Sequence, residues 1–225
     1  MSPLHIGAVH FFTDLGADPV VFARAAESMG FESLFVPEHT HFPVSRTSPY
    51  PPSYGGGTLP SYYLRTLDQT VVLSMIAAGT TTLKLGTGIC LLAQHDPISK
   101  AKELATLDRL SGGRLIFGVG FGWNVDEAQA HGVVWSQRFS VVRDKVAIIR
   151  ALWTQDEARY DGPRASLPPS WAWPTPALPP PVYLGGAGPA TMRHAAEWAD
   201  TWYVVPPPDD LTLERSIPRF RQIVE

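Results

Sequence analysis

Several stretches of the chain combine polar side chains or glycines in patterns that site chemistry requires. Glu38 and His39 stand side by side in PEHTH, where a carboxylate can hold an imidazole in one tautomer or raise its pKa. Glycines cluster in GVGFGW (118–123) and in GGAGP (185–189). Such turns let the backbone approach a ligand and direct free N–H groups at an anion. The sequence thus offers a proton-handling pair and an anion site.

The two glycine clusters differ in what they can bind. GVGFGW begins like the dinucleotide fingerprint GxGxxG, but its sixth residue is Trp123, whose bulk prevents the close helix packing that the last glycine provides. In GGAGP, three glycines precede Pro189 and Thr191 at the start of a predicted helix, so N–H groups and the helix dipole converge there. A phosphate fits this second turn; the alternative is a tight turn that needs glycine only for its backbone.

The other reactive side chains allow plainer interpretations. His39 at a strand end could be a structural, hydrogen-bonded residue rather than a catalyst. Glu38, His39 and His41 fall on alternating faces of an extended segment, so no metal site is predicted from them. Cys90 lies in an apolar strand and is predicted to be a small buried hydrophobe rather than a nucleophile.

Composition limits the class of protein. The 225 residues are 44% hydrophobic and 17% charged, which is typical of one globular domain with a sizeable core. A net charge of -3 offers no basic surface for nucleic acid, and no apolar run is long enough to cross a membrane. The N-terminus has no basic region ahead of its apolar residues, and a single cysteine forms no intrachain disulfide. We therefore expect a cytoplasmic protein.

Strands and helices are expected to alternate along the chain. Predicted strands cover 4–11, 33–39, 84–92, 114–120, 181–186 and 201–205, and predicted helices cover 19–29, 65–79, 97 to the glycines at 112–113, 136–153, 189–199 and 210–224. The first helix has Asp18 as N-cap and an apolar face of Val21, Phe22, Ala25 and Met29. Six βα units predict a parallel sheet with its site at the carboxyl ends of the strands, either an open sheet or a barrel of eight strands.

Two segments interrupt this pattern. Residues 155–181 hold too many prolines for a helix or a strand ladder and are expected to form a rigid surface connection. Residues 40–64 form a long loop rich in tyrosine, proline and glycine. Because loops of this length commonly act as lids or binding loops, we expect it to cover the site and to supply Phe42, Tyr50, Tyr54, Tyr62 and Tyr63 as aromatic contacts.

Three stretches resemble the luciferase-like flavin- or deazaflavin-dependent oxidoreductases, specifically the branch assigned to coenzyme F420. They are VPEHTHFP, the run from TLDQ to GFGW (66–123) and LGGAGPATMRHAAEWADTW (184–202), and they cover most of 4–205. The resemblance implies a single domain, 1–225, of the (β/α)8-barrel type. The chain stops in what should be the sixth helix, so the expected barrel is a fragment, is completed by a partner chain, or is inactive.

The resemblance also implies a cofactor site. F420 would lie at the carboxyl ends of the strands, with its phosphate toward Gly185, Gly186, Ala187 and Gly188. Glu38 and His39 would contact the deazaflavin, with His39 handling the proton and Glu38 as its partner. The ring would lie over a cis peptide at Gly88-Ile89 and against Gly120, Phe121 and Gly122, and the substrate would contact Phe42, Tyr62, Tyr63 and Trp123.

The expected activity is hydride transfer between F420 and a small organic substrate. Some F420-dependent sugar-phosphate dehydrogenases carry a glutamate where this chain has Trp123, so that activity is not expected. One alternative is an FMNH2-dependent monooxygenase of the same fold that uses O2. Another is a truncated, non-catalytic barrel that binds a protein partner. A homodimer remains open.

Overall fold

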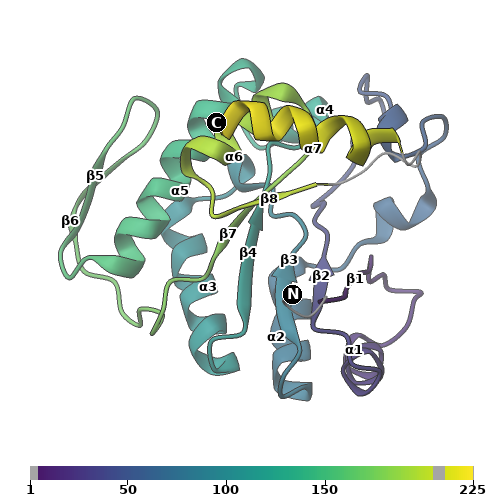
Figure 1. Cartoon of the computed structure of the whole chain (residues 1–225), viewed down its shortest axis with the longest axis horizontal. Helices are drawn as coiled ribbons and strands as arrows, with labels where there is room; N and C mark the ends of the chain where they lie inside the picture. Colours follow the sequence, from purple (N-terminus) through teal and green to yellow (C-terminus); the bar gives the residue numbers. More distant parts are fainter. Residues whose placement is uncertain (1–4, 205–210, 225) are drawn as a thin grey trace.

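The computed structural model describes residues 5–204 and 211–224, and Figure 1 shows their arrangement. Within these residues one six-stranded parallel sheet has the order β1-β2-β3-β4-β7-β8. Its strands are β1 (Gly7–Val9), β2 (Ser33–Val36), β3 (Lys84–Thr87), β4 (Leu115–Val119), β7 (Val182–Gly185) and β8 (Thr201–Tyr203). All six predicted strands are present, although Leu4 and Val205 at their predicted ends lie outside the described residues.

The sheet curves into a half-barrel rather than an open, flat sheet. Phe35 of β2 stacks on Tyr203 of β8, with ring centroids 5.1 Å apart, although three strands separate β2 from β8 in the sheet order. Only a strongly curved sheet brings these strands face to face. The predicted (β/α)8-type architecture is confirmed over the six βα units that the chain contains.

Helices surround the sheet, most of them on its outer face and a short one beside the carboxyl ends of the strands. They are α1 (Pro19–Ser28), α2 (Gln69–Gly79), α3 (Pro97–Ser111), α4 (Val125–Ala130), α5 (Arg138–Thr154), α6 (Pro189–Trp198) and α7 (Leu211–Val224). Asp18 and Asp96 cap α1 and α3 by accepting hydrogen bonds from backbone N–H groups of the first turn. The helix predicted at 65–79 begins only at Gln69, after a short 3₁₀ helix at Ser61–Arg65, and residue 210 of the last predicted helix lies outside the described residues.

The predicted inner face of α1 was wrong except for Phe22, which packs against the core. Val21 and Met29 are 68% and 75% exposed, whereas the small residues Ala23 and Ala26 are buried. Alanines let the helix lie close to the sheet, and this close approach outweighs the burial of larger side chains on another face.

The prediction for 155–181 also needs correction. Its first part forms an antiparallel hairpin of β5 (Ala158–Asp161) and β6 (Ser166–Ser170), which projects from α5 in Figure 1. Pro168 and Pro169 lie within β6, and the pairing register shifts where they occur. A two-stranded hairpin has free edges, so prolines that donate no hydrogen bond are tolerated there.

Two charged side chains fasten the end of the sheet opposite the strand carboxyl ends. Glu27 at the end of α1 accepts hydrogen bonds from the backbone N–H groups of residues 81–83. Arg114, just before β4, donates to Ser111 O, Thr80 Oγ1, Leu83 O, Ala77 O and Thr80 O. These contacts hold α1, α2 and α3 against the sheet, a stabilising role expected at this end of a barrel.

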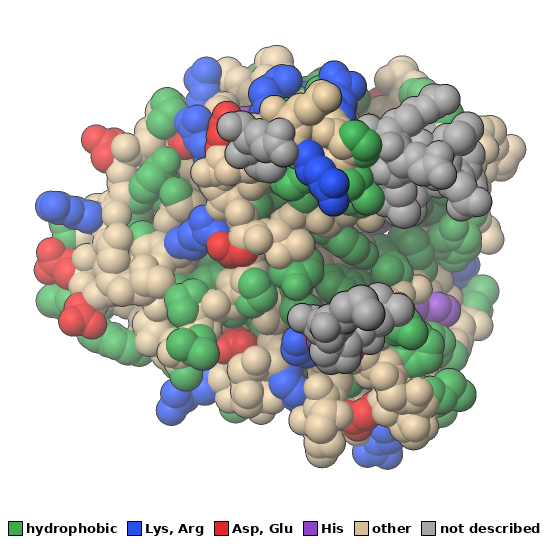
Figure 2. All heavy atoms as spheres, in the orientation of Figure 1, with side chains coloured by type: hydrophobic (Ala, Val, Ile, Leu, Met, Phe, Trp, Pro, Cys, Tyr) green, Lys and Arg blue, Asp and Glu red, His purple; other side chains and the backbone are tan. Residues whose placement is uncertain are grey.

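The inside of the half-barrel is partly open. Figure 2 shows hydrophobic side chains gathered across the middle of the face that Figure 1 presents. At the edge strand β1, Ile6 and Val9 are 57% and 54% exposed.

In the described part of the chain, no helix has the length and apolar character needed to cross a membrane.

Candidate functional site

A pocket of about 550 Å³ lies at the carboxyl ends of the strands. Residues that follow β2, β3, β4 and β7 line it together, as expected for the ligand-binding end of a barrel. The lining includes these predicted site residues: Glu38, His39, Tyr63, Gly88, Ile89, Phe121, Gly122, Trp123, Gly185 and Gly186. Its volume falls within the range of about 300–1,000 Å³ that is usual for small-molecule sites.

His39 is paired with Glu127, not with Glu38 as predicted. His39 Nδ1 lies 2.7 Å from Glu127 Oε2. Glu127 is fully buried, and the His39 side chain is 6% exposed. The other carboxylate oxygen, Glu127 Oε1, accepts a 3.0 Å hydrogen bond from the backbone N–H of Thr40. The pair therefore links the segment after β2 to α4, which follows β4.

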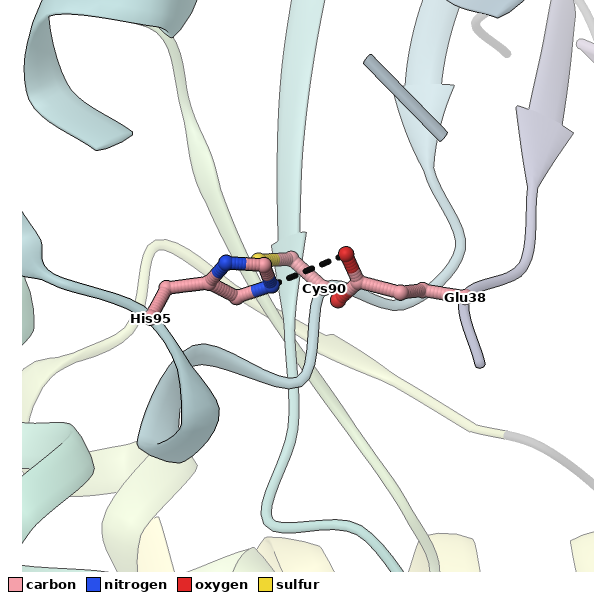
Figure 3. Close-up of side chains that lie close together, drawn as sticks. All are labelled: Glu38, Cys90 and His95. Atoms are coloured by element: carbon pink, nitrogen blue, oxygen red, sulfur yellow. Dashed lines mark hydrogen bonds and ion pairs between the residues drawn. The ribbon is translucent and has the colours of Figure 1, made fainter. Parts of the chain in front are cut away.

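Glu38 has a different set of partners, of which Figure 3 shows His95. Its Oε1 lies 2.9 Å from His95 Nε2, and its Oε2 accepts a hydrogen bond from the backbone N–H of Leu91. Burial by itself raises the pKa of Glu38, but these hydrogen bonds hold it below the usual value. The predicted Glu38–His39 contact fails because neighbouring residues in an extended segment point to opposite sides.

Cys90 completes this group but is chemically quiet. A ligand atom from each of Glu38, Cys90 and His95 lies within 4.8 Å of the others. Burial, followed by the charge of Glu38, raises the pKa of the Cys90 thiol well above its usual value. A metal needs a thiolate and free carboxylate oxygens, whereas here the thiolate is disfavoured and both Glu38 oxygens already have donors. The prediction that Cys90 is a buried hydrophobe is confirmed, since it is 0% exposed.

Aromatic rings enclose His39. Its ring centroid lies 4.7 Å from Phe42, 5.2 Å from Tyr63 and 5.6 Å from Trp123. Tyr63, Trp123 and Tyr54, which were predicted as aromatic contacts, line the pocket, and so does Phe11, which was not predicted. Tyr50 is buried but does not line the pocket. Phe42 and Tyr62 do not line it; they pack behind the wall, on His39 and Tyr63 respectively. Segment 40–64 thus supplies part of the pocket wall.

Two glycines near the pocket make room for the Ile89 side chain. A Cβ on Gly185 would lie 2.6 Å from Ile89 Cγ2, and one on Gly120 would lie 3.1 Å from Ile89 Cγ1. The Ile89 side chain therefore occupies the space beside Gly120. Gly120 does not line the pocket, contrary to the prediction that it lies against the cofactor ring. Gly122 does line the pocket, and its φ of +73° explains why glycine stands there. The Gly88-Ile89 peptide is cis, as expected.

The turn after β7 meets an arginine at the pocket. Gly186 and Thr191 line the pocket beside Arg138, whereas Ala187 and Gly188 do not, and Gly188 is the N-cap of α6. The Arg138 guanidinium lies 4.0 Å from the Trp135 ring centroid. Its Nε is buried and has no hydrogen-bond partner among the described residues. A buried, unpartnered N–H of a cation beside a helix N-terminus suits an anionic group.

The carboxylate of Asp126 holds the first part of segment 40–64 in place. Asp126 accepts hydrogen bonds from the backbone N–H groups of Thr47 and Ser48 and from both hydroxyls. These hydrogen bonds, that of the Ser48 hydroxyl above all, lower the pKa of Asp126. Segment 40–48 is thereby attached to α4.

Sequence reasoning missed Glu127 and Arg138. Glu127 lies three residues after Asn124, the N-cap of α4, and this spacing is typical of a capping box whose glutamate turns back to the N-cap. Here the glutamate turns to His39 instead. Arg138 is the first residue of α5. An arginine at the positive end of a helix is unfavourable unless an anion binds nearby. Its position at the start of a predicted helix could therefore have indicated an anion site.

Comparison with known sequences gives the following relatives. A family model described as "Luciferase-like monooxygenase" matches residues 16–225. An uncharacterised protein of Mycobacterium tuberculosis is 47% identical over 206 residues, which cover 90% of this chain and 73% of the relative. An F420-dependent glucose-6-phosphate dehydrogenase of Amycolatopsis mediterranei is 28% identical over 187 residues, which cover 81% of this chain and 51% of the relative.

Solved structures of the same fold are longer than this chain. Monooxygenase RslO1 from Streptomyces bottropensis superposes with a TM-score of 0.78 at 21% identity, covering 98% of this chain and 66% of that one. The coenzyme F420-dependent tetrahydromethanopterin reductase of Methanopyrus kandleri gives 0.78 at 20% identity, with coverage of 99% and 62%. The chain thus spans less than two thirds of these structures, and the likeness shows the fold.

Proposed function

Because the chain belongs to the luciferase-like monooxygenase family, we propose that it is an oxidoreductase that binds coenzyme F420 in the pocket and acts on a small organic substrate. One observation carries the proposal: His39, held by the buried Glu127, lines the same pocket as Arg138 and the glycine turn after β7. A proton-handling group and an anion site are the two features that a phosphate-bearing hydride carrier requires of its protein. The F420-dependent relative supports this cofactor.

The residues of the pocket fit a phosphate group. Arg138 offers an unpartnered, buried Nε–H. Pro189 is the first residue of α6, so the N–H groups of Ala190 and Thr191 are among those without a partner inside the helix. Burial lowers the pKa of Arg138, but a guanidinium stays protonated at neutral pH. Arg138 and the first turn of α6 would therefore hold the phosphate.

The rest of the pocket fits a flat ring and an uncharged substrate. Ile89 and Gly122 offer an apolar surface to the pocket, which Phe11, Tyr54, Tyr63 and Trp123 also line; Tyr63 and Trp123 lie against His39. Burial raises the pKa of Tyr63 far above its usual value, so its hydroxyl stays neutral. When bound, F420 supplies a carbon that accepts or donates hydride. The aromatic wall excludes water, and His39 accepts or returns the substrate proton.

Separate titrations with oxidised F420 and with FMN test the proposal. We expect F420 to bind and raise the melting temperature, and FMN to bind more weakly. Arg138→Met should weaken F420 binding about 10- to 100-fold, since a hydrogen bond to a charged group contributes about 1.5–3 kcal/mol. Arg109→Met, which changes an exposed arginine of α3, is the control and should leave binding unchanged.

The outcomes separate the alternatives. Preferential binding of FMN would favour a flavin-dependent monooxygenase. If neither cofactor binds, the cofactor proposal fails and a non-catalytic or partner-binding role is favoured. If F420 binds equally well to Arg138→Met and to the unmodified protein, the assignment of the phosphate site is wrong.

A further inference from the structure

His39 and Glu127 lie in a hydrogen-bond arrangement in which the direction of each bond can be assigned. A carboxylate only accepts hydrogen bonds, and the backbone N–H of Thr40 only donates. Thr40 N–H therefore donates to Glu127 Oε1 at 3.0 Å. The 2.7 Å contact between His39 Nδ1 and Glu127 Oε2 then requires a proton on Nδ1.

We infer that Glu127 is a positioning residue that fixes His39 as its Nδ1–H tautomer and leaves Nε2 free for the pocket. No other polar side chain of the described residues is hydrogen-bonded to the His39 ring. The neighbours on its remaining sides are the rings of Phe42, Tyr63 and Trp123. Glu127 thus determines which nitrogen of His39 can accept a proton.

The position of Glu127 is itself well determined. It is 0% exposed, and its backbone N–H donates to Asn124 at the start of α4. The Thr40 hydroxyl, 3.5 Å from Glu127 Oε1, also lies 2.7 Å from His131 Nε2 and 3.0 Å from His41 Nδ1. His41 and His131 thus help to orient Thr40. The Thr40 N–H in turn binds Glu127 Oε1, which leaves Oε2 to face His39.

A glutamine at position 127 should reverse the tautomer. The Thr40 N–H needs an acceptor, so the amide oxygen of Glu127→Gln is expected to occupy the place of Oε1. The amide NH2 group then faces His39 Nδ1 as a donor. His39 Nδ1 must accept this bond, and the proton moves to Nε2.

The catalytic consequence rests on the proposed function, but the tautomer does not. With Nε2 unprotonated, neutral His39 can take the proton of a substrate hydroxyl as hydride leaves the carbon, and it returns that proton in the reverse direction. With the proton on Nε2, the neutral ring cannot act as this base. Loss of a positioned general base commonly lowers kcat about 10²- to 10⁴-fold.

Nitrogen-15 NMR of the cofactor-free protein tests the assignment directly. In protein labelled with 15N-histidine, at a pH where the His39 ring is neutral, the two ring nitrogens have distinct shifts that report which one carries the proton. We expect Nδ1–H in the unmodified protein and Nε2–H in Glu127→Gln, with the resonance of His39 identified by its absence in His39→Asn. Glu157→Gln, the same change at an exposed glutamate that does not line the pocket, is the control and should leave the His39 tautomer unchanged.

The result can overturn the inference without any cofactor. An Nε2–H tautomer in the unmodified protein would refute it even if Glu127→Gln failed to fold, and an unchanged Nδ1–H tautomer in folded Glu127→Gln would also refute it. If F420 fails to bind, the proposed function falls while the tautomer assignment stands. If F420 turnover is observed, Glu127→Gln should lower kcat and leave the Kd of F420 unchanged.

Discussion

A methyl group at position 120 would collide with Ile89, which gives a quantitative prediction for the floor of the pocket. The Cβ of an alanine there would lie 3.1 Å from Ile89 Cγ1 and closer still to Cδ1. Gly120 does not have a positive φ, so its backbone conformation by itself admits alanine. Overpacking costs about 1–3 kcal/mol, and we expect Gly120→Ala to lower the free energy of unfolding by this amount.

Removal of the Ile89 Cδ1 atom should relieve the collision. Ile89→Val by itself is expected to cost about 0.5–1.5 kcal/mol. If the two changes were independent, the double variant would lose about 1.5–4.5 kcal/mol, the sum of the two ranges. Valine lacks Cδ1, the atom of closest approach, and leaves only the 3.1 Å contact with a γ carbon. We therefore expect the double variant to lose little more than Ile89→Val, which corresponds to a coupling energy of about 1–3 kcal/mol.

Urea unfolding of the parent, the two single variants and the double variant measures this coupling. Gly132→Ala is the control, because Gly132 has a φ of +76° and no atom within 4 Å of an added Cβ. Its cost arises from the backbone alone and should be the same with isoleucine or valine at position 89. A coupling energy between positions 120 and 89 below about 0.5 kcal/mol, the limit for independent sites, would refute the steric explanation of Gly120.

Three further predictions concern charged side chains. Burial alone would raise the pKa of Glu27, but hydrogen bonds from residues 81–83 lower it from 4.5 to about 2. The contribution of Glu27 to the free energy of unfolding should therefore be fully present above pH 4.5 and be lost as the pH falls toward 2. Glu27→Gln should reduce the free energy of unfolding by about 1–2 kcal/mol at neutral pH and by less in acid, as measured by urea unfolding. Arg114→Ala should cost about 2–4 kcal/mol, because it leaves several carbonyl oxygens without a donor, and should lower the melting temperature. Asp126→Asn should speed the hydrogen exchange of the Thr47 and Ser48 amides.

Each of these predictions has a control. For Glu27→Gln the control is Asp156→Asn, which changes an acid that accepts no such hydrogen bonds among the described residues. It should leave the loss of stability at low pH unchanged. If Glu27→Gln and the parent protein differ equally at all pH values, the carboxylate of Glu27 is not the cause. Arg114→Lys should recover only part of the loss, since one ammonium cannot reach acceptors on three segments; full recovery would contradict the geometry. Exchange at Thr47 that is unaffected by Asp126→Asn would show that the loop is held elsewhere.

Local signals in the sequence predicted the elements of the fold. Asp18 and Asp96 precede prolines at helix starts, and side-chain capping depends only on residues two or three positions away. The periodic apolar runs likewise located all six parallel strands. Curvature of the sheet could not be derived from these signals, because it depends on contacts such as that of Phe35 with Tyr203, far apart in the chain.

The candidate site shows the same division. Glycine turns and PEHTH correctly indicated which segments meet at the pocket. The partner of His39 was wrong because Glu127 lies 88 residues away, whereas Glu38 is adjacent only in sequence. The prediction that Val21 and Met29 face inward failed for a related reason. Helix α1 carries apolar side chains on more than one face, and the periodicity does not say which face meets the sheet.

The hydrogen bonds of Asp126 to Thr47 and Ser48 have a consequence for ligand affinity. A binding loop that is mobile in the free protein loses conformational entropy when a ligand orders it, and that loss weakens binding. Here the first part of segment 40–64 is already held against α4 by backbone and hydroxyl donors. Its entropy is therefore lost on folding rather than on association, so the wall near His39 is preorganised, and a substrate should meet it with little further ordering of residues 40–48.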